Sequence, residues 1–223
     1  MGAPTFAPKA VAFDLDGTLI ASKGDIAAAC NHALVAVGRA RLDEEVIARF
    51  VGDGARVLLA RALDRAPDDA LVDLALATFH PFYEAHAAVH TTLLPGAIEV
   101  MDALAPRPIL LVTNKPRGST MAVLKALDIT SRFAFIRAGS DGPLKPDPRA
   151  VTDALAAVSV VPSEAWMVGD AEQDVRAGRA AGCATVIVRG GFQSAERVAA
   201  SEPDLIVSTL HDVAALVREL DGG

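Results

Sequence analysis

Two aspartates separated by one residue follow a short apolar run near the start of the chain. Asp14 and Asp16 come directly after the apolar residues 10–13, and Gly17 follows them. Successive residues of an extended chain point to opposite faces, so the two carboxylates would share a face while Leu15 returns to the core. Two interpretations remain open from this stretch alone: a paired-carboxylate site, and a strand that ends in an acidic, solvated turn.

Three more polar segments occur later in the chain, each at or beyond the end of an apolar run. Thr113 and Asn114 end the first run, Lys145 lies beyond the second, and Asp170 ends the third, with Asp174 four residues later. Taken singly, these segments are typical of a turn, a solvated loop and a helix N-cap. Because the carboxyl ends of parallel strands meet at one edge of a sheet, their joint occurrence predicts a single site there.

These residue types suit phosphoryl transfer. A carboxylate that attacks a phosphate dianion is repelled by it, so cations must lie against the phosphoryl oxygens. Asp14 and Asp170 offer hard oxygen ligands for Mg²⁺, and Lys145 adds a second positive charge. The Thr113 hydroxyl can donate to the remaining oxygens, which leaves Asp16 to protonate the departing oxygen and later to activate water. The set therefore favours hydrolysis through an aspartyl-phosphate intermediate.

The elements that position these residues alternate along most of the chain. Apolar, strand-like runs are separated by segments with helical spacing, which predicts a parallel sheet with helices on both faces. Residues 1–20 and 94–223 would form this α/β catalytic core. We expect strands at 10–13, 108–113, 133–138, 165–169, 184–189 and 205–207, and helices at 97–104, 118–127, 149–158, 174–181 and 213–220.

The segment between these two parts of the core has a different pattern. No strand-like run occurs in it, and its apolar residues recur at helical spacing. Residues 21–93 are therefore expected to form an all-helical cap domain inserted after the first strand, with hinges near 21–22 and 92–93. We expect its helices at 25–37, 42–50, 55–65 and, as one or two helices, 67–90.

Composition limits the class of partner. The net charge of −7 argues against a general nucleic-acid binder, and no stretch is long and apolar enough for a membrane span. The first nine residues lack the apolar segment of a signal peptide, and Cys30 and Cys183 are expected to be buried free thiols. These features predict a cytoplasmic protein without a nucleic-acid or membrane partner. From the phosphoryl-transfer chemistry, the expected partner is a small phosphorylated metabolite, and the expected state is a monomer or a homodimer.

The polar segments together resemble the four motifs of the haloacid dehalogenase superfamily. The resemblance covers essentially the whole chain and implies a Rossmann-like core with a helical cap. The matching segments are Asp14-Leu15-Asp16-Gly17-Thr18, Thr113-Asn114, Lys145 and Gly169-Asp170-x-x-x-Asp174.

This resemblance assigns expected roles. Asp14 would be the nucleophile and Asp16 the general acid and base. Mg²⁺ would be held by the Asp14 side chain, the Asp16 main-chain carbonyl and Asp170. Asp174 would mainly contact these ligands and would not bind the ion directly. The substrate phosphoryl group would be bound by Thr113 and Lys145, and Asn114 would be a further substrate-binding residue.

Further segments resemble the phosphoglycolate phosphatase branch, which makes 2-phosphoglycolate the expected substrate. The loop 52–54 would fold over the active site, where backbone N–H groups such as that of Gly54, together with Arg56, would meet the substrate carboxylate; a simple link between two helices is the other interpretation. Residues 21–23 depart from the Asp-Ser pair common in this branch, which leaves the exact substrate open. The segments concerned are 24–26, 51–59, 94–96 and 113–116.

Several alternatives share this core. A sugar phosphate, a nucleotide or pyrophosphate could replace phosphoglycolate as substrate. A phosphosugar mutase and a non-catalytic binding protein are less favoured, the latter because no catalytic carboxylate is missing. A dehalogenase would not need an acid at Asp16, and a phosphonatase would need a cap lysine, which the chain lacks between Lys23 and Lys115.

Overall fold

A six-stranded parallel sheet forms the centre of the computed structural model, which describes residues 3–222. The strand order is β5-β4-β1-β6-β7-β8, so the chain builds one half of the sheet outward from β1 and then crosses over to build the other. The order therefore reverses between β1 and β6, which is where open α/β sheets bind ligands. The strands are β1 (Ala10–Phe13), β4 (Ile109–Val112), β5 (Phe135–Arg137), β6 (Ala165–Gly169), β7 (Ala184–Val188) and β8 (Leu205–Val207).

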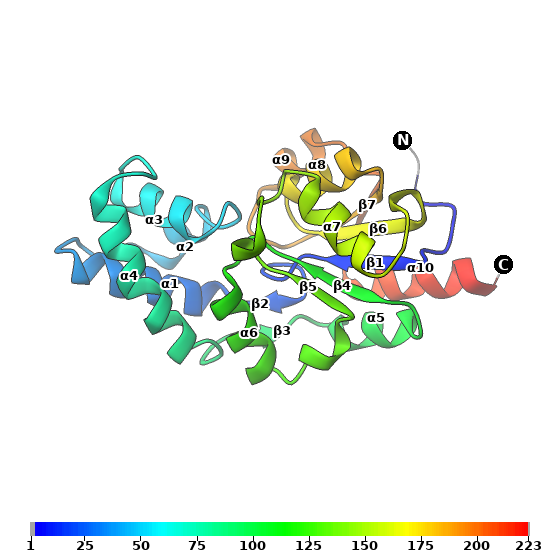
Figure 1. Ribbon diagram of the computed structural model, residues 1–223, viewed down its shortest axis with the longest axis horizontal. Coiled ribbons are helices and arrows are strands. Elements are labelled where there is room, and N and C mark those ends of the chain that lie inside the picture. Colours follow the sequence, from blue (N-terminus) through cyan, green and yellow to red (C-terminus); the bar gives the residue numbers. More distant parts are fainter. Residues whose placement is uncertain (1–2, 223) are drawn as a thin grey trace.

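Helices cover both faces of the sheet (Figure 1). Alternate residues of β1 supply the two faces: Val11 and Phe13 pack into the core beneath α5, α6 and α10, whereas Ala10 and Ala12 pack towards α7 and α8. All residues of β1, β4 and β6 are buried, as expected for strands covered on both sides. The helices are α5 (Ala97–Leu104), α6 (Arg117–Ala126), α7 (Arg149–Ala157), α8 (Glu172–Ala181), α9 (Ala195–Ala200) and α10 (Leu210–Gly222).

Four helices between β2 and β3 lie beyond one end of the sheet, at the left of Figure 1. We call this segment, residues 22–91, the helical insert. The chain leaves through β2 (Ile20–Ala21) and returns through β3 (Thr92–Leu93), and these two strands pair antiparallel, with Ala21 opposite Thr92. The helices of the insert are α1 (Lys23–Ala36), α2 (Glu44–Ala48), α3 (Ala55–Leu63) and α4 (Ala70–Ala85).

A buried carboxylate ties the two ends of the insert together. Asp25, in the first turn of α1, accepts hydrogen bonds from the backbone N–H of His90 (3.0 and 3.1 Å) and Thr91 (2.9 Å), and from the Thr91 hydroxyl (2.7 Å). Because His90 and Thr91 directly precede β3, this cluster joins the outgoing connection to the returning one.

The elements that were predicted occur with the expected type and in the expected order, and the differences have local causes. Helix α10 begins earlier than expected because the Asp212 carboxylate accepts hydrogen bonds from the Ser208 and Thr209 backbone N–H groups. Helix α2 is shorter than the expected 42–50, since the chain turns through Gly52 and Gly54, both at positive φ. The pair β2–β3 and the short helix α9 were not predicted, because two-residue strands and a six-residue helix carry little periodicity.

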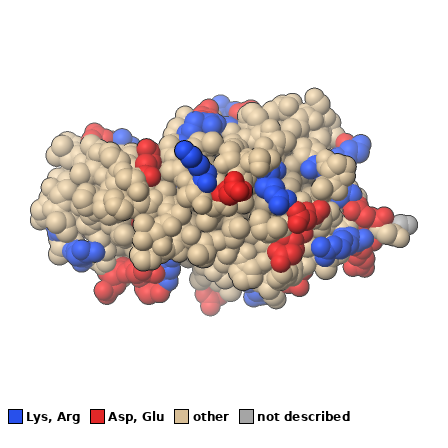
Figure 2. All heavy atoms as spheres, turned by 90° about the horizontal axis from the view of Figure 1, so that it is seen from below, with Lys and Arg blue, Asp and Glu red and all other residues tan. Residues whose placement is uncertain are grey.

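The surface and the helices bear on the kind of partner that the protein can bind. On the face drawn in Figure 2, acidic and basic side chains are interspersed, without a continuous basic surface. Among residues 3–222, none of the helices has both the length and the apolar character needed to span a bilayer.

Candidate active site

The carboxyl ends of β1 and β6 bring Asp14 and Asp170 together where the strand order reverses. The Asp14 backbone N–H donates to Val168 O (2.9 Å) and so extends the pairing of the two strands to this edge. Immediately afterwards Gly17 turns the chain away at φ +89°, and a Cβ there would lie 2.6 Å from an Asp170 oxygen. Only glycine therefore lets the first loop approach the second this closely.

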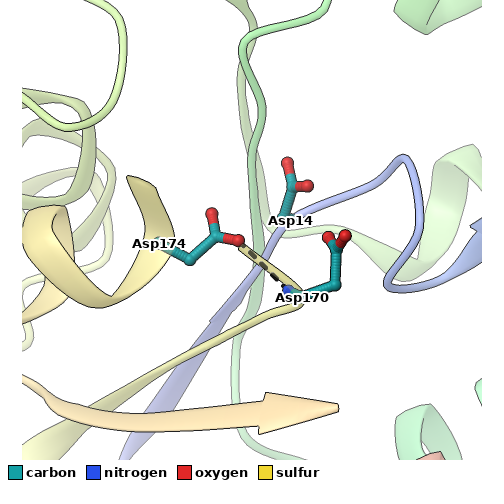
Figure 3. A group of neighbouring side chains, drawn as sticks. All are labelled: Asp14, Asp170 and Asp174. Atoms are coloured by element: carbon teal, nitrogen blue, oxygen red, sulfur yellow. Dashed lines mark hydrogen bonds between the residues drawn. The ribbon is translucent and has the colours of Figure 1, made fainter. Parts of the chain in front are cut away.

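Three carboxylates gather at this point (Figure 3). Asp14, Asp170 and Asp174 each place an oxygen within 4.8 Å of the other two. Asp170 is fixed by the Thr18 hydroxyl (2.9 Å) and the Phe192 N–H (3.0 Å). Asp174 is fixed by the N–H groups of Asp170 (3.1 Å) and Ala171 (3.0 Å) at the start of α8.

Lys145 supplies the positive charge on one side of this cluster. Its Nζ donates to Asp14 Oδ1, Asp174 Oδ1 and Val112 O, each at 2.7 Å. The loop that carries Lys145 is held in turn by Asn114, whose side-chain oxygen accepts from the Lys145 N–H (2.8 Å) and whose amide donates to the Lys145 carbonyl (2.9 Å). The ammonium group is thus buried and held by three hydrogen bonds, and its backbone is held by two more.

One lysine does not balance the charge of these three closely spaced acids, of which Asp170 and Asp174 are buried and Asp14 is partly buried. Burial raises the pKa of Asp14 to about 6, with Lys145 opposing the rise and Asp174 adding to it. The pKa of Asp170 lies well above its ordinary value, because of burial first and the neighbouring acids second. A divalent metal ion binds hard, closely spaced oxygens whose negative charge is not balanced by nearby cations, so this cluster could hold one.

Asp16 has a separate environment. Its carboxylate accepts hydrogen bonds from the Ser22 hydroxyl (2.6 Å) and from Lys115 Nζ (2.9 and 3.1 Å). Leu15 between the two aspartates is fully buried, as the alternation predicts. Asp14 and Asp16 line the same cavity, so the chain presents both carboxylates to one space.

The helical insert closes this cavity from the other side. Its apolar side chains Leu58 and Phe79 and its loop 51–55 face the acidic edge of the sheet. Asn114 donates to Gly52 O (2.9 Å), and Gln173 donates to Asp53 Oδ1 (2.6 Å), so the loop is hydrogen-bonded to the core at two points.

The structure brings all but one of the expected site residues to this cavity. The expected residues that line it are Asp14, Asp16, Gly54, Thr113, Asn114, Lys145, Asp170 and Asp174. Arg56 is the exception: its guanidinium is exposed and bonds to Asp73 and to Pro67 O, both at 2.8 Å. The expectation that Arg56 meets the substrate therefore has no geometric support, because α3 directs this side chain along the insert surface.

Other residues in the cavity were not predicted from the sequence. Lys115 could have been found from the sequence, because it directly follows Thr113 and Asn114. Tyr83 lies one helical turn after Phe79, and this spacing also fits an ordinary core position. Ser119 and Gln173 resemble ordinary first-turn residues, and only the fold shows that they face the cavity.

Comparison with known proteins agrees with this geometry. A family model described as haloacid dehalogenase-like hydrolase matches residues 11–188. A phosphoglycolate phosphatase of Pseudomonas putida is 37% identical over 216 residues, covering 93% of this chain and 79% of that protein. The Escherichia coli phosphoglycolate phosphatase is 32% identical over 228 residues, covering 92% and 90%. The crystal structure of a predicted phosphoglycolate phosphatase from Haemophilus somnus superposes with a TM-score of 0.85 at 28% identity, covering 96% and 99%. The chain belongs to the haloacid dehalogenase-like hydrolase family.

Proposed function

We propose that this chain is a Mg²⁺-dependent phosphatase that hydrolyses a small phosphomonoester, 2-phosphoglycolate, through an aspartyl-phosphate intermediate. The observation that carries the proposal is the meeting of Asp14, Asp170 and Lys145 at one edge of the sheet, with Asp16 in the same cavity. A nucleophile, a source of positive charge and a proton donor are thereby within reach of one substrate.

In the first step, a carboxylate oxygen of Asp14 bonds to phosphorus and the ester bond breaks. Asp16 gives its proton to the departing oxygen, so the alcohol leaves in neutral form. In the second step Asp16 takes a proton from water, which attacks the aspartyl phosphate, releases inorganic phosphate and restores Asp14. Lys145, 2.7 Å from Asp14, offsets the negative charge that builds up around phosphorus.

The residues that would hold Mg²⁺ are the Asp14 and Asp170 carboxylates and the main-chain carbonyl of Asp16. When bound, the ion supplies further positive charge against the phosphoryl oxygens. Asp174 would position its neighbours, because its two oxygens already accept from Lys145 and from two backbone N–H groups. Thr113 would donate to a phosphoryl oxygen. Asn114 would act by holding the Lys145 loop, to which its amide is already bonded.

Residues 21–93 would act as a cap domain over the catalytic core formed by 1–20 and 94–223. The cap would admit substrate by turning about 21–22 and 92–93, and would then exclude bulk water, which favours transfer of the phosphoryl group to Asp14 in the first step. The loop around Gly54 supports this role, since it is hydrogen-bonded to the core and lines the cavity.

The choice of 2-phosphoglycolate is supported by the relatives that carry the name phosphoglycolate phosphatase at 32–37% identity over more than nine-tenths of this chain. The test is an assay of phosphate release from 2-phosphoglycolate, a hexose phosphate, a nucleoside monophosphate and pyrophosphate, each with Mg²⁺ and with a chelator. We expect the highest kcat/KM for 2-phosphoglycolate and loss of turnover with chelator. Equal activity on all four compounds would overturn the choice of substrate, and metal-independent turnover would overturn the proposed chemistry.

A further inference from the structure

Two buried hydroxyl groups in the cavity have no hydrogen-bond partner. Tyr83 OH comes from helix α4 of the insert and Ser119 Oγ from the first turn of α6, and both side chains line the cavity with residue exposures of 2% and 1%. A buried hydroxyl without a partner costs free energy, so native proteins rarely retain one that nothing binds. Each hydroxyl can donate one hydrogen bond to an acceptor that enters the cavity.

A buried ammonium group lies at the same wall. Lys115 Nζ is 4.2 Å from the centre of the Tyr83 ring and bonds to both Asp16 oxygens at 2.9 and 3.1 Å. Its side chain is 6% exposed. An ammonium group has three donors, and the contact with a single carboxylate leaves it able to donate to a second acceptor.

We infer that Lys115, Tyr83 and Ser119 form a carboxylate-binding subsite that selects phosphate esters whose leaving group is itself an anion. The inference rests on the proposed function, because it takes Asp16 as the group that faces the leaving oxygen. A donor set of one ammonium and two hydroxyls matches an acceptor with two oxygens and a negative charge.

The position of Lys115 relative to Lys145 separates this subsite from the phosphoryl site. Lys145 bonds to Asp14 and Asp174 on the phosphoryl side, whereas Lys115 bonds to Asp16 on the leaving-group side. A group attached to the leaving alcohol by one carbon would therefore lie against Lys115. Among the described residues that line the cavity, these two lysines are the only basic side chains.

Part of the remaining wall is apolar, which disfavours a polyhydroxylated leaving group there, whereas Gln173 and Gln193 line another part. Ile26, Leu58 and Phe79 add apolar surface from the insert and offer no partners for the hydroxyls of a sugar. A short carboxylated alcohol satisfies the three donors, whereas a polyhydroxylated one would leave its own polar groups unpaired. Arg56, the other candidate for a carboxylate, is bonded to Asp73 outside the cavity.

The experiment compares 2-phosphoglycolate with 2-hydroxyethyl phosphate, a neutral ester of similar size, in the wild type and in Tyr83→Phe. The variant keeps the ring beside Lys115 and removes only the hydroxyl. We expect the variant to lose about tenfold in kcat/KM for 2-phosphoglycolate, mainly through KM, and to stay within about twofold for the neutral ester. Ser119→Ala should show the same selective loss and gives a second, independent variant should Tyr83→Phe unfold.

The matched control is Ser163→Ala, an exposed serine remote from the cavity, which should leave both values unchanged. Equal losses on both esters, or no loss on either in both folded variants, would overturn the subsite while the phosphatase assignment stands. Failure of the wild type to hydrolyse either ester with Mg²⁺ would instead overturn the proposed function.

Discussion

Asp14 and Asp16 each have a lysine of their own, although only one residue separates them. Lys145 bonds to Asp14, which also faces the other buried acids, while Lys115 bonds to Asp16, which faces the insert. The two chemically identical groups, two positions apart in the chain, therefore have different polar neighbours. Each proposed role, nucleophile and proton donor, can be tested with one substitution.

We expect Asp14→Asn to reduce turnover of 2-phosphoglycolate by at least about a thousandfold, because an amide does not replace the carboxylate as nucleophile. The fold should persist, since the change removes one of three crowded acids and leaves Lys145 bonded to Asp174. The measurement is phosphate release together with circular dichroism. A folded variant with wild-type turnover would refute the assignment of the nucleophile.

The raised pKa of Asp14 also predicts how stability depends on pH in metal-free buffer. Burial raises this pKa from 3.8 to about 6, so the folded protein holds the proton more tightly than the unfolded chain does. The stability that the protonated group contributes is complete below about pH 4 and is lost as the pH rises through about 6. The loss in the free energy of unfolding amounts to about 3 kcal/mol.

Urea unfolding of the wild type and Asp14→Asn across this pH range, in chelator, measures the effect. We expect the free energy of unfolding of the wild type to decline relative to that of the variant as the pH rises. Asp170, with its pKa also raised, acts in the same direction in the wild type. Parallel pH dependences in the two proteins would contradict the prediction.

At the residue scale, the positions of the acids and Lys145 at or beyond the ends of apolar runs predicted that they would meet at one edge of the sheet, and the structure brings them together there. Tyr83 and Ser119 could not be recognised in this way, since a tyrosine at core spacing and a serine in a first helical turn are both ordinary. They are relevant because tertiary packing buries both hydroxyls without hydrogen-bond partners. No local sequence pattern encodes this result.

At the scale of elements, a hydrogen-bond cluster joins the start of α1 to the segment before β3, where the chain enters and leaves the insert. The Asp25 carboxylate is 4% exposed and accepts from His90 N–H and from two donors of Thr91. Removing it would leave buried backbone donors unpaired at the point where the insert joins the core.

We expect Asp25→Ala to lower the free energy of unfolding by about 2–4 kcal/mol, because several charge-assisted hydrogen bonds are lost together. Hydrogen exchange should accelerate at 90–92 before it does so in the sheet. Asp68→Ala, which removes an exposed carboxylate of the insert, is the control and should change stability by less than about 0.5 kcal/mol. Equal stabilities of the two variants would show that Asp25 has no anchoring role.

The elements of the sheet were predictable because burial on both faces makes each strand a continuous apolar run between helices. Residues 97–104, 165–169 and 205–207 were predicted with the bounds that the structure has. The pairing of β2 with β3 was not, because two residues of each strand cannot establish a periodicity and their partners are more than 70 positions apart in the sequence.

For the whole molecule, the acidic cluster couples metal binding to stability. A ligand that binds only the folded state stabilises it by mass action, by about 2.7 kcal/mol at a hundred times its Kd. We therefore expect saturating Mg²⁺ to raise the Tm of the wild type by roughly 5 °C or more. Asp170→Asn should abolish most of this rise, and thermal unfolding with and without Mg²⁺ measures it. An equal rise in the variant would place the ion elsewhere.

The strands β2 and β3 also bear on how such a chain can change over evolutionary time. The insert departs at Ala21 and returns at Thr92, and these residues face each other across one short ladder. Everything between two adjoining points can be exchanged by recombination without rerouting the remaining polypeptide. The part of metabolite recognition that the insert supplies, Tyr83 among it, can thus change through replacement of one contiguous gene segment, while Lys115 and Ser119 are inherited with the reaction centre.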